Sequence, residues 1–382
     1  MWALQTINSM DPQLGGPSSC TYDLMQGLHE IGAKVDLLTL RCRDAKAHNL
    51  GEGCQWLKEA ENDCWTPLEL SHNLKQALRA TDYDVYHANT LWKYQSHITC
   101  KMAREKGRPY IMSAHGMLYP NALQMKRWKK QPMLWMWYNK DFQKASCLHA
   151  TCKEEMEHYR EFGYKGPVAV IPNAVVIPHD VECATVKPEG RKQIGFLGRL
   201  HPIKKVENVL YAIAQLTTIE RSQLVFKIMG KFDDGYERFL RDEVNRLDLG
   251  AEVEFLGFVS GKEKYDILKD LTALFVPSES ENFGMIVPEA LICGTPVYAS
   301  LGTPWKELNQ YGCGWWRDNR PEIIAGVIRE ILAATNEAII EMGHRGRSLI
   351  EEKYEQHKVA AMMLDLYEWI TGNGAKPSFV FE

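Results

Sequence analysis

Short apolar runs alternate with longer segments of helical spacing along most of the chain. Runs typical of buried strands lie at 1–7, 35–39, 84–89, 110–114, 146–151, 168–171, 193–197, 224–229, 253–256 and 273–276. Segments with the spacing of amphipathic helices lie at 21–31, 68–80, 98–106, 153–162, 205–217, 236–247, 262–270, 286–293 and 353–370. Strands that alternate with helices predict parallel sheets with helices on both faces, which is a doubly wound α/β fold.

Prolines and glycines between Pro172 and Gly190 interrupt this alternation and predict a linker. A chain of 382 residues is also too long for one ordinary core. We therefore expect two Rossmann-like domains, 1–176 and 177–352, that face each other across a central cleft. The final segment, 353–382, holds a helix with no partner left in the second domain, so we expect it to cross back to the first.

Composition narrows the class of protein. Lysines and arginines number 45 against 49 aspartates and glutamates, which gives a net charge of −4 and no overall field for nucleic acid. The ten cysteines form no CxxC pair and no zinc-finger spacing, so we interpret them as reduced thiols of a cytoplasmic protein. The N-terminus lacks the pattern of an export signal, and no apolar run approaches bilayer length. The sequence predicts neither export nor a membrane span.

The segment 278–291 combines a polar loop with the start of a helix, and it carries Glu281 in the loop and Glu289 in the helix. The backbone amides of Phe283, Gly284 and Met285 lie where a helix start offers free N–H groups to an anion or to sugar hydroxyls. Carboxylates accept hydrogen bonds from hydroxyl-rich ligands. The segment predicts a sugar-nucleotide site, although a solvated loop glutamate and a first-turn glutamate would give the same pattern.

The loop 198–205 places Arg199 after one strand and Lys205 at the start of the next helix. Fixed cations there can stabilise the charge on a diphosphate leaving group without a metal, whereas solvated surface cations are the alternative. Asp82-Tyr83-Asp84 resembles the metal-binding DxD of some transferases, but it opens a strand rather than following one. We therefore expect no metal and no other cofactor.

The first half contributes a glycine loop and a histidine. Gly15-Gly16 precedes a helix and lets a backbone approach phosphate, but the GxGxxG of dehydrogenases is absent. His115 directly follows the strand at 110–114, where open α/β sheets bind ligands, although a lone histidine is often structural. The segment 41–66 shows no clear pattern, and we interpret it as a loop.

Cationic and aromatic residues are mixed in the segment 123–142, where we expect Pro132 to start a helix. Two interpretations stay open. The lysines and exposed aromatics can lie on an anionic membrane or meet a lipid-linked acceptor, which would place the protein peripherally on the cytoplasmic face. Alternatively, the tryptophans pack under the helix as core. The residues in question are Lys126, Arg127, Trp128, Lys129, Lys130, Met133, Trp135, Met136, Trp137 and Tyr138.

Together these elements resemble the retaining glycosyltransferases of family 4, the glycosyl transferases group 1. The resemblance spans nearly the whole chain and rests on Gly15-Gly16, His115, Pro172-Asn173, Gly198-Arg199 with Lys205, and Glu281 to Glu289. It implies a GT-B fold, a nucleotide-diphosphate sugar donor held mainly by the second domain and an acceptor held by the first. It also implies metal-independent transfer with retained anomeric configuration, in which the nucleotide sugar is a substrate rather than a cofactor.

The resemblance assigns roles to single residues. Arg199 and Lys205 contact the donor diphosphate, Glu289 the ribose and Glu281 the donor sugar. The amides of Phe283, Gly284 and Met285 contact sugar hydroxyls or phosphate, and Gly16 contacts the diphosphate. His115 lies near the reacting carbon. Phe258, within Gly257-Phe258-Val259, lies beside the nucleobase. His115, Glu281, Arg199 and Lys205 form the expected catalytic set. Whether Glu281 is a nucleophile or a positioning group stays open, and we favour positioning.

The chain departs from the family pattern at two places. Gly302-Thr303-Pro304-Trp305-Lys306-Glu307 stands where many members have Gly-Gly-x-x-Glu, and Asn89 stands where a histidine is often found. Leu91-Trp92 and Gly314-Trp315-Trp316 resemble members that assemble bacterial polysaccharides. We therefore expect sugar transfer to a glycan or lipid-linked acceptor during synthesis of capsule, exopolysaccharide or lipopolysaccharide. A GT-B-like sugar-nucleotide epimerase and a non-catalytic nucleotide-sugar binding protein are the alternatives.

Overall fold

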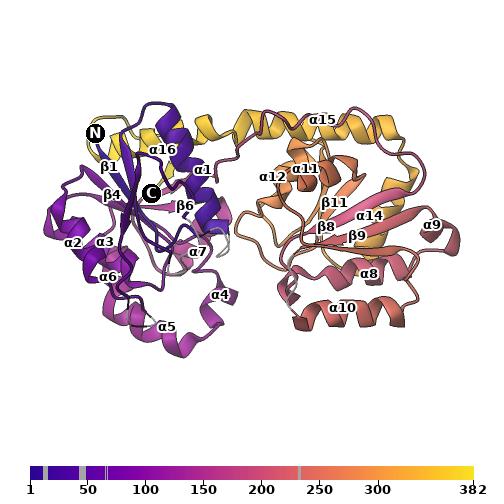
Figure 1. Ribbon diagram of the computed structural model, residues 1–382, viewed down its shortest axis with the longest axis horizontal. Coiled ribbons are helices and arrows are strands. Elements are labelled where there is room, and N and C mark those ends of the chain that lie inside the picture. Colours follow the sequence, from indigo (N-terminus) through magenta and orange to yellow (C-terminus); the bar gives the residue numbers. More distant parts are fainter. Residues whose placement is uncertain (12–15, 43–48, 65, 67, 231–233) are drawn as a thin grey trace. The chain divides into compact units, whose positions relative to one another are not determined.

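The computed structural model describes residues 1–382 except 12–15, 43–48, 65, 67 and 231–233. Gly15 therefore lies outside the described residues, whereas Gly16 lies within them. The chain forms two compact units, Met1–Val176 with Tyr354–Glu382 and Ile177–Lys353. Each unit is built around its own sheet with helices on both faces (Figure 1), which confirms the predicted α/β class with two doubly wound domains.

The sheet of the first unit has the order β14-β7-β6-β5-β4-β1-β2-β3. All its pairings are parallel except that of β14 with β7. Its strands are β1 (Ala3–Thr6), β2 (Val35–Leu40), β3 (Leu57–Ala60), β4 (Val85–Asn89), β5 (Tyr110–Ser113), β6 (Cys147–Ala150), β7 (Val168–Val170) and β14 (Val380–Phe381). The strand order reverses at β1, so the carboxyl ends of β1, β4 and β5 form the edge where such sheets bind ligands.

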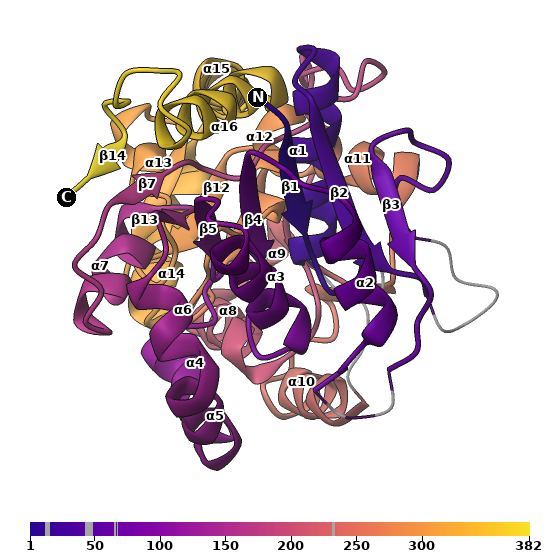
Figure 2. The same cartoon turned by 90° about the vertical axis from the view of Figure 1, so that its left-hand side faces the viewer.

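The helices of the first unit are α1 (Gly16–Glu30), α2 (His72–Ala80), α3 (Tyr94–Glu105), α4 (Pro120–Gln124), α5 (Arg127–Met133), α6 (Asn139–Gln143), α7 (Lys153–Glu161) and α16 (Gln356–Ile370). Helix α16 packs beside α1, as Figures 1 and 2 show. Gly27 permits this approach, because a Cβ on it would lie 2.9 Å from the Gln356 carbonyl oxygen. The packing ties the end of the chain to the first sheet.

Three local predictions for the first unit are wrong. Helix α1 begins at Gly16 rather than at residue 21, because Pro17 fits the first turn of a helix, where its missing N–H costs nothing. The segment interpreted as a loop contains β3, an edge strand with one buried position and no clear alternation. Helix α3 begins at Tyr94, four residues before the predicted start.

The expectation that Pro132 starts a helix is also wrong, because Pro132 lies inside α5. Helix α5 continues through a π-helical turn, Leu134–Tyr138, into α6. A π turn bonds each N–H one residue further back than an α turn, as the amide of Asn139 does to the carbonyl of Leu134. The helical run thus continues past the proline, which removes one backbone donor without ending the helix.

The second unit has a fully parallel sheet in the order β10-β9-β8-β11-β12-β13. Its strands are β8 (Lys192–Leu197), β9 (Leu224–Met229), β10 (Val253–Gly257), β11 (Ala273–Val276), β12 (Val297–Ser300) and β13 (Gly314–Arg317). Its helices are α8 (Val206–Ala214), α9 (Thr218–Ser222), α10 (Asp234–Arg246), α11 (Gly261–Asp270), α12 (Ile286–Ile292), α13 (Glu307–Gln310), α14 (Pro321–Ala333) and α15 (Asn336–Lys353). The carboxyl ends of β8 and β11 lie side by side at one edge of this sheet.

A buried lysine lies at the opposite edge of this sheet, where β11 and β12 begin. The side chain of Lys187 donates to the carbonyls of Lys269 and Leu271, at 2.8 and 2.7 Å, and to the hydroxyl of Thr295 at 3.0 Å. These carbonyls end α11, and a helix end favours a cation. Burial nevertheless lowers the pKa of Lys187 to about 8.

This lowered pKa predicts a pH-dependent stability. Between pH 8 and the pKa of about 10.4 of an unfolded lysine, the unfolded chain binds more protons than the folded one, so stability rises with pH, by about 3 kcal/mol over the interval. The free energy of urea unfolding at pH 7.5 and 10 measures the rise. We expect Lys187→Met to lose this component and the exposed control Lys262→Met to keep it; equal slopes in both variants would contradict the assignment.

Candidate functional site

The cation loop, which we define as residues 198–205, follows β8 at the carboxyl edge of the second sheet. Arg199 is exposed and has no hydrogen-bond or ion-pair partner within the described part of the chain. Lys205 precedes α8 in a left-handed conformation (φ 52°), and its Nζ lies 3.3 Å from Oε2 of Glu279. The loop therefore presents one guanidinium without a partner among the described residues and two ammonium groups, those of Lys204 and Lys205, each paired with a carboxylate.

The glutamate loop, residues 278–285, follows β11 and meets the cation loop. The amide of Glu279 donates to the carbonyl of Ile203 at 2.8 Å, which joins the two loops directly. Oε1 of Glu281 accepts from the Lys204 ammonium and, at 2.8 Å, from the Ser278 hydroxyl. The structure thus places Glu281 and the cations of the first loop at one sheet edge, with the carboxylate held in a fixed direction.

Trp305 supports the middle of the glutamate loop. Its buried indole packs on the ring of Phe283, with ring centroids 5.1 Å apart, and its Nε1–H donates to the Phe283 carbonyl. Because the C=O and N–H of a trans peptide point in opposite directions, this bond turns the Gly284 N–H away from Trp305. Gly284 needs its left-handed φ of 79° for this course. Neither its amide nor that of Met285 has an acceptor among the described residues.

Glu289 lies in α12, and its Oε2 is 3.0 Å from Nζ of Lys264 on α11. Phe258 follows β10 and is 68% exposed, after Gly257 has turned the chain with a φ of 78°. A carboxylate and an exposed aromatic face are the groups that would bind ribose hydroxyls and stack on a base. No hydrogen bond or ion pair between described residues links Phe258 to Glu289.

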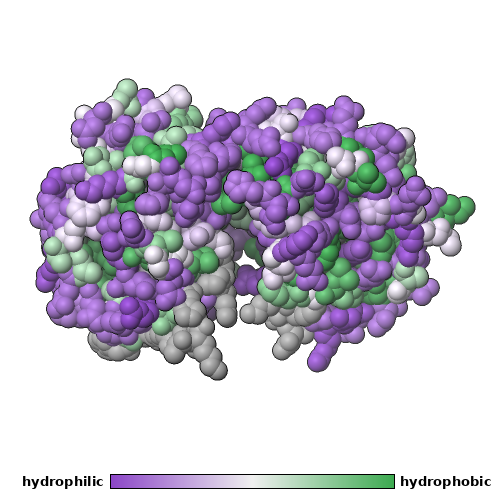
Figure 3. All heavy atoms as spheres, turned by 45° about the horizontal axis from the view of Figure 1, so that its top comes forward, coloured by the Kyte–Doolittle hydropathy of each residue, from purple (hydrophilic) through white to green (hydrophobic). Residues whose placement is uncertain are grey.

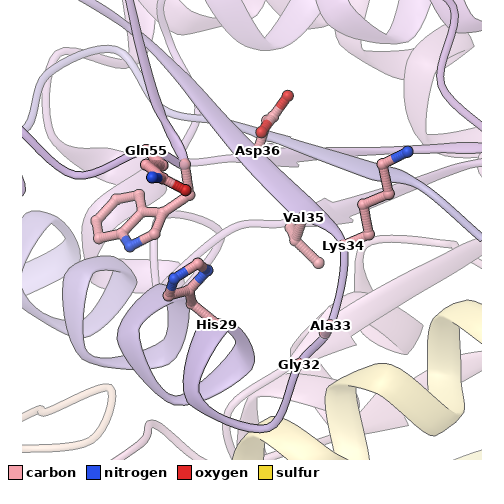
Figure 4. A pocket seen from close by; sticks show the side chains of 8 residues that line it. His29, Gly32, Ala33, Lys34, Val35, Asp36 and Gln55 are labelled. Carbon is pink, nitrogen blue, oxygen red and sulfur yellow. The ribbon is translucent and has the colours of Figure 1, made fainter.

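A cavity of about 550 Å³ adjoins the cation loop. It is lined by His201, Pro202, Glu207, Gly235, Tyr236 and Phe239. A second cavity, of about 340 Å³, lies in the first unit where α1 leads into β2, lined by His29, Gly32–Asp36, Gln55 and Trp56 (Figure 4). It lies at the amino end of β2, whereas His115 lies at the carboxyl edge of the same sheet. We therefore do not consider this cavity a candidate donor site.

His115 follows β5 in a left-handed conformation (φ 51°). The buried carboxylate of Glu155 accepts from the amide of the next residue, Gly116, at 2.6 Å and from the amide of Thr151 at 2.8 Å. Nε2 of His115 lies 3.1 Å from Oδ1 of Asn89. Burial lowers the pKa of His115 to about 3, so its ring is neutral near pH 7. The residue is rigidly held rather than a solvated histidine.

Gly16 is the first residue of α1 and is exposed, and no atom of the other described residues lies within 4 Å of a Cβ placed on it. The segment Asp82-Tyr83-Asp84 lies at the amino end of β4, where Asp82 accepts from Arg108 and Asp84 from the amide of Trp2. In the described parts of the chain, no group of three or more His, Cys, Asp or Glu side chains is placed to hold a metal ion.

Several residues of the site were not identified from the sequence. Lys204, Ser278 and Trp305 fix the glutamate loop, and Lys264 pairs with Glu289. Lys204 could have been identified because it lies beside Lys205, and Trp305 because it lies in the segment that departs from the family pattern. Ser278 lies only three residues before Glu281, in the segment already singled out, whereas Lys264 gave no signal because Glu289 becomes its neighbour only in the folded unit.

Two family models match the chain. One is described as Glycosyltransferase Family 4 and matches residues 14–177, and the other as Glycosyl transferases group 1 and matches residues 183–347. An uncharacterised glycosyltransferase of Methanocaldococcus jannaschii is 27% identical over 47% of this chain and 45% of its own length. A D-inositol 3-phosphate glycosyltransferase of Frankia alni is 27% identical over 57% of each chain. The chain thus matches about half the length of these relatives.

Solved structures share the fold. Anabaena HepE in complex with UDP and glucose is 18% identical, with a TM-score of 0.75 over 97% of this chain and 100% of that one. Sucrose-phosphate synthase of Thermosynechococcus elongatus is 19% identical, with a TM-score of 0.77 over 97% and 100%. At such identities the likeness shows the fold alone.

Proposed function

Because the chain belongs to the group 1 glycosyltransferases and has their GT-B fold, we propose that it transfers a sugar from a nucleotide-diphosphate sugar to an acceptor, with retained configuration. One observation carries the proposal: the cation loop and the glutamate loop meet at one sheet edge, where Arg199 has no partner among the described residues and Lys204 holds Glu281. Cations for a diphosphate and a carboxylate for sugar hydroxyls are what such a donor needs.

Within this proposal, Glu281 acts as a positioning group. Its Oε1 is occupied by Lys204 and Ser278, whereas Oε2 has no partner among the described residues and can accept a sugar hydroxyl. An ammonium on a carboxylate withdraws charge and weakens it as a nucleophile. Arg199 and Lys205 stabilise the departing diphosphate, Glu289 and Phe258 hold the nucleoside, and the amides of Phe283, Gly284 and Met285, with Gly16, complete the donor contacts.

The acceptor is proposed to be a glycan or a lipid-linked glycan of a cell-surface polysaccharide, bound by the first unit beside His115. The experiment is a donor screen that follows nucleotide release with and without acceptor extracts, starting from UDP-sugars because HepE was solved with UDP and glucose. Acceptor-dependent release supports transfer. Release without acceptor indicates an epimerase-like reaction, and binding without turnover indicates a non-catalytic protein.

The helical run 127–143 supports a membrane contact as part of this proposal. Its aromatics divide between two faces: Trp137 stacks on His97, with ring centroids 4.7 Å apart, and Tyr138 is buried, whereas Trp128 and Trp135 are 74% and 82% exposed. Met125, Lys126, Arg127, Lys129 and Met136 are exposed as well. By contrast, the face in Figure 3 is mostly hydrophilic, with scattered apolar areas. Among the described helices, none is long and apolar enough to span a bilayer.

We predict that the protein binds anionic vesicles through this exposed face and that binding weakens with salt. Each lysine or arginine near an anionic surface contributes about 1 kcal/mol, so changing Lys126, Arg127, Lys129 and Lys130 together to Gln should abolish most binding. Flotation with phosphatidylserine vesicles measures it. The matched control changes three lysines and one arginine of the same unit, Lys58, Arg79, Lys101 and Lys165, to Gln. Equal flotation of both variants would contradict the prediction.

A further inference from the structure

A continuous chain of hydrogen bonds runs through the first unit to His115, and one end fixes the direction of every proton in it. Nε2 of His149 lies 2.8 Å from the Ile171 carbonyl, which can only accept, so this nitrogen carries the hydrogen. Burial lowers the pKa of His149 to about 4, so the ring is neutral and its Nδ1 must accept. The Ser113 hydroxyl, 2.7 Å from Nδ1, therefore donates to it.

The next links follow in the same way. Having donated its only hydrogen, Ser113 accepts from Nε2 of His87 at 2.6 Å. Burial keeps the pKa of His87 well below its ordinary value, so Nδ1 accepts from the Tyr367 hydroxyl at 2.9 Å. Tyr367, on α16, in turn accepts from Nε2 of Gln5 at 2.9 Å.

Gln5 then presents its amide oxygen to Asn89. Oε1 of Gln5 accepts from Nδ2 of Asn89 at 3.0 Å, which turns Oδ1 of Asn89 toward Nε2 of His115. An amide oxygen only accepts, so His115 carries its hydrogen on Nε2 and has a bare lone pair on Nδ1. Gln5, His87, Asn89, Ser113, His149 and Tyr367 are all buried, so water does not compete for these bonds.

We propose that Tyr367 and Gln5 are positioning residues that fix His115 in the Nε2–H tautomer, so that its Nδ1 accepts a hydrogen bond from a hydroxyl of the bound donor sugar. The assignment of the hydroxyl to a donor sugar rests on the proposed function. No described residue bonds Nδ1, and Glu155 holds the backbone beside the ring through Gly116. A neutral acceptor nitrogen matches a hydroxyl and not a phosphate, which offers no proton near pH 7.

The test is ¹⁵N NMR of protein with labelled histidines, with His115 assigned by its loss in His115→Gln. We expect a protonated Nε2 and an unprotonated Nδ1 from pH 5.5 to 8.5. Tyr367→Phe removes the donor to His87 and the acceptor of Gln5, so the two His115 tautomers should mix. The matched control is Tyr110→Phe, another buried tyrosine of the first unit, whose hydroxyl donates to the Asp141 carbonyl outside the chain of bonds; it should leave the His115 spectrum unchanged.

Kinetics give the second arm. We expect kcat/KM of Tyr367→Phe to fall about tenfold, as for one lost hydrogen bond, while the affinity for free nucleotide diphosphate stays unchanged because it lacks the sugar. A hydrogen on Nδ1 in the wild type, an unaltered His115 spectrum in Tyr367→Phe, or a parallel loss of nucleotide affinity would overturn the proposal. The NMR measurement needs no donor. If the spectra are as expected but no sugar transfer is detected, the tautomer assignment is supported and only the proposed function is contradicted.

Discussion

The Glu281→Ala variant is expected to lose kcat by a factor of about 10²–10³, the range for one lost preorganised interaction. Glu281 is assigned to the donor sugar, which reorganises as its anomeric bond breaks, so the contact strengthens toward the transition state. The structure holds this carboxylate between Lys204 and Ser278, so it need not reorganise during the reaction. Steady-state kinetics with saturating acceptor measure the loss.

Glu289→Ala should behave differently. Its carboxylate is assigned to the ribose, which is bound equally in the ground and transition states, so donor KM rises with a smaller effect on kcat. Calorimetry with free nucleotide diphosphate is the control measurement: affinity should drop in Glu289→Ala and barely change in Glu281→Ala. Glu263→Ala, an exposed neighbour on α11, is the control variant for lost surface charge. The opposite ordering would mean that the two roles are reversed.

The parallel sheets and the edges of the candidate site could be predicted from the sequence because both depend on local patterns. Buried strands read as apolar runs, and a residue just after such a run lies at the carboxyl edge of its sheet, as His115 and Arg199 do. Edge strands gave no such signal. β3 has one buried position, and β14 has two residues and pairs with β7 across more than half the chain.

The partners of the site residues could not be predicted, because they come from distant segments. Lys204 reaches Glu281 across 77 positions and Tyr367 reaches His87 across 280, with no local pattern to link them. The segment 123–142 shows the same limit in another form. Its composition left two interpretations open, and only the structure shows that Trp137 packs on His97 whereas Trp128 and Trp135 are exposed.

The second large effect is expected at the cation loop. Arg199→Ala should lower kcat by a factor of about 10²–10³, because the guanidinium has no other partner among the described residues and can meet the leaving diphosphate with two N–H groups. Arg199→Lys should recover part of the rate, because lysine restores the positive charge but not the two parallel N–H donors of the guanidinium. Lys205→Ala should cost less, because its ammonium is already shared with Glu279 at 3.3 Å.

Chelation separates this mechanism from a metal-dependent one. If Arg199 and Lys205 stabilise the leaving group themselves, wild-type transfer persists in EDTA, and Mg²⁺ does not rescue Arg199→Ala. The control Arg320→Ala removes an exposed arginine of the same unit whose partner is Asp318, and it should keep full activity. Activity that EDTA removes and Mg²⁺ or Mn²⁺ restores would contradict the assignment. A divalent ion would then bridge the diphosphate, and the rate would depend on Arg199 only weakly, because a bound ion is the largest local charge in any site that holds one.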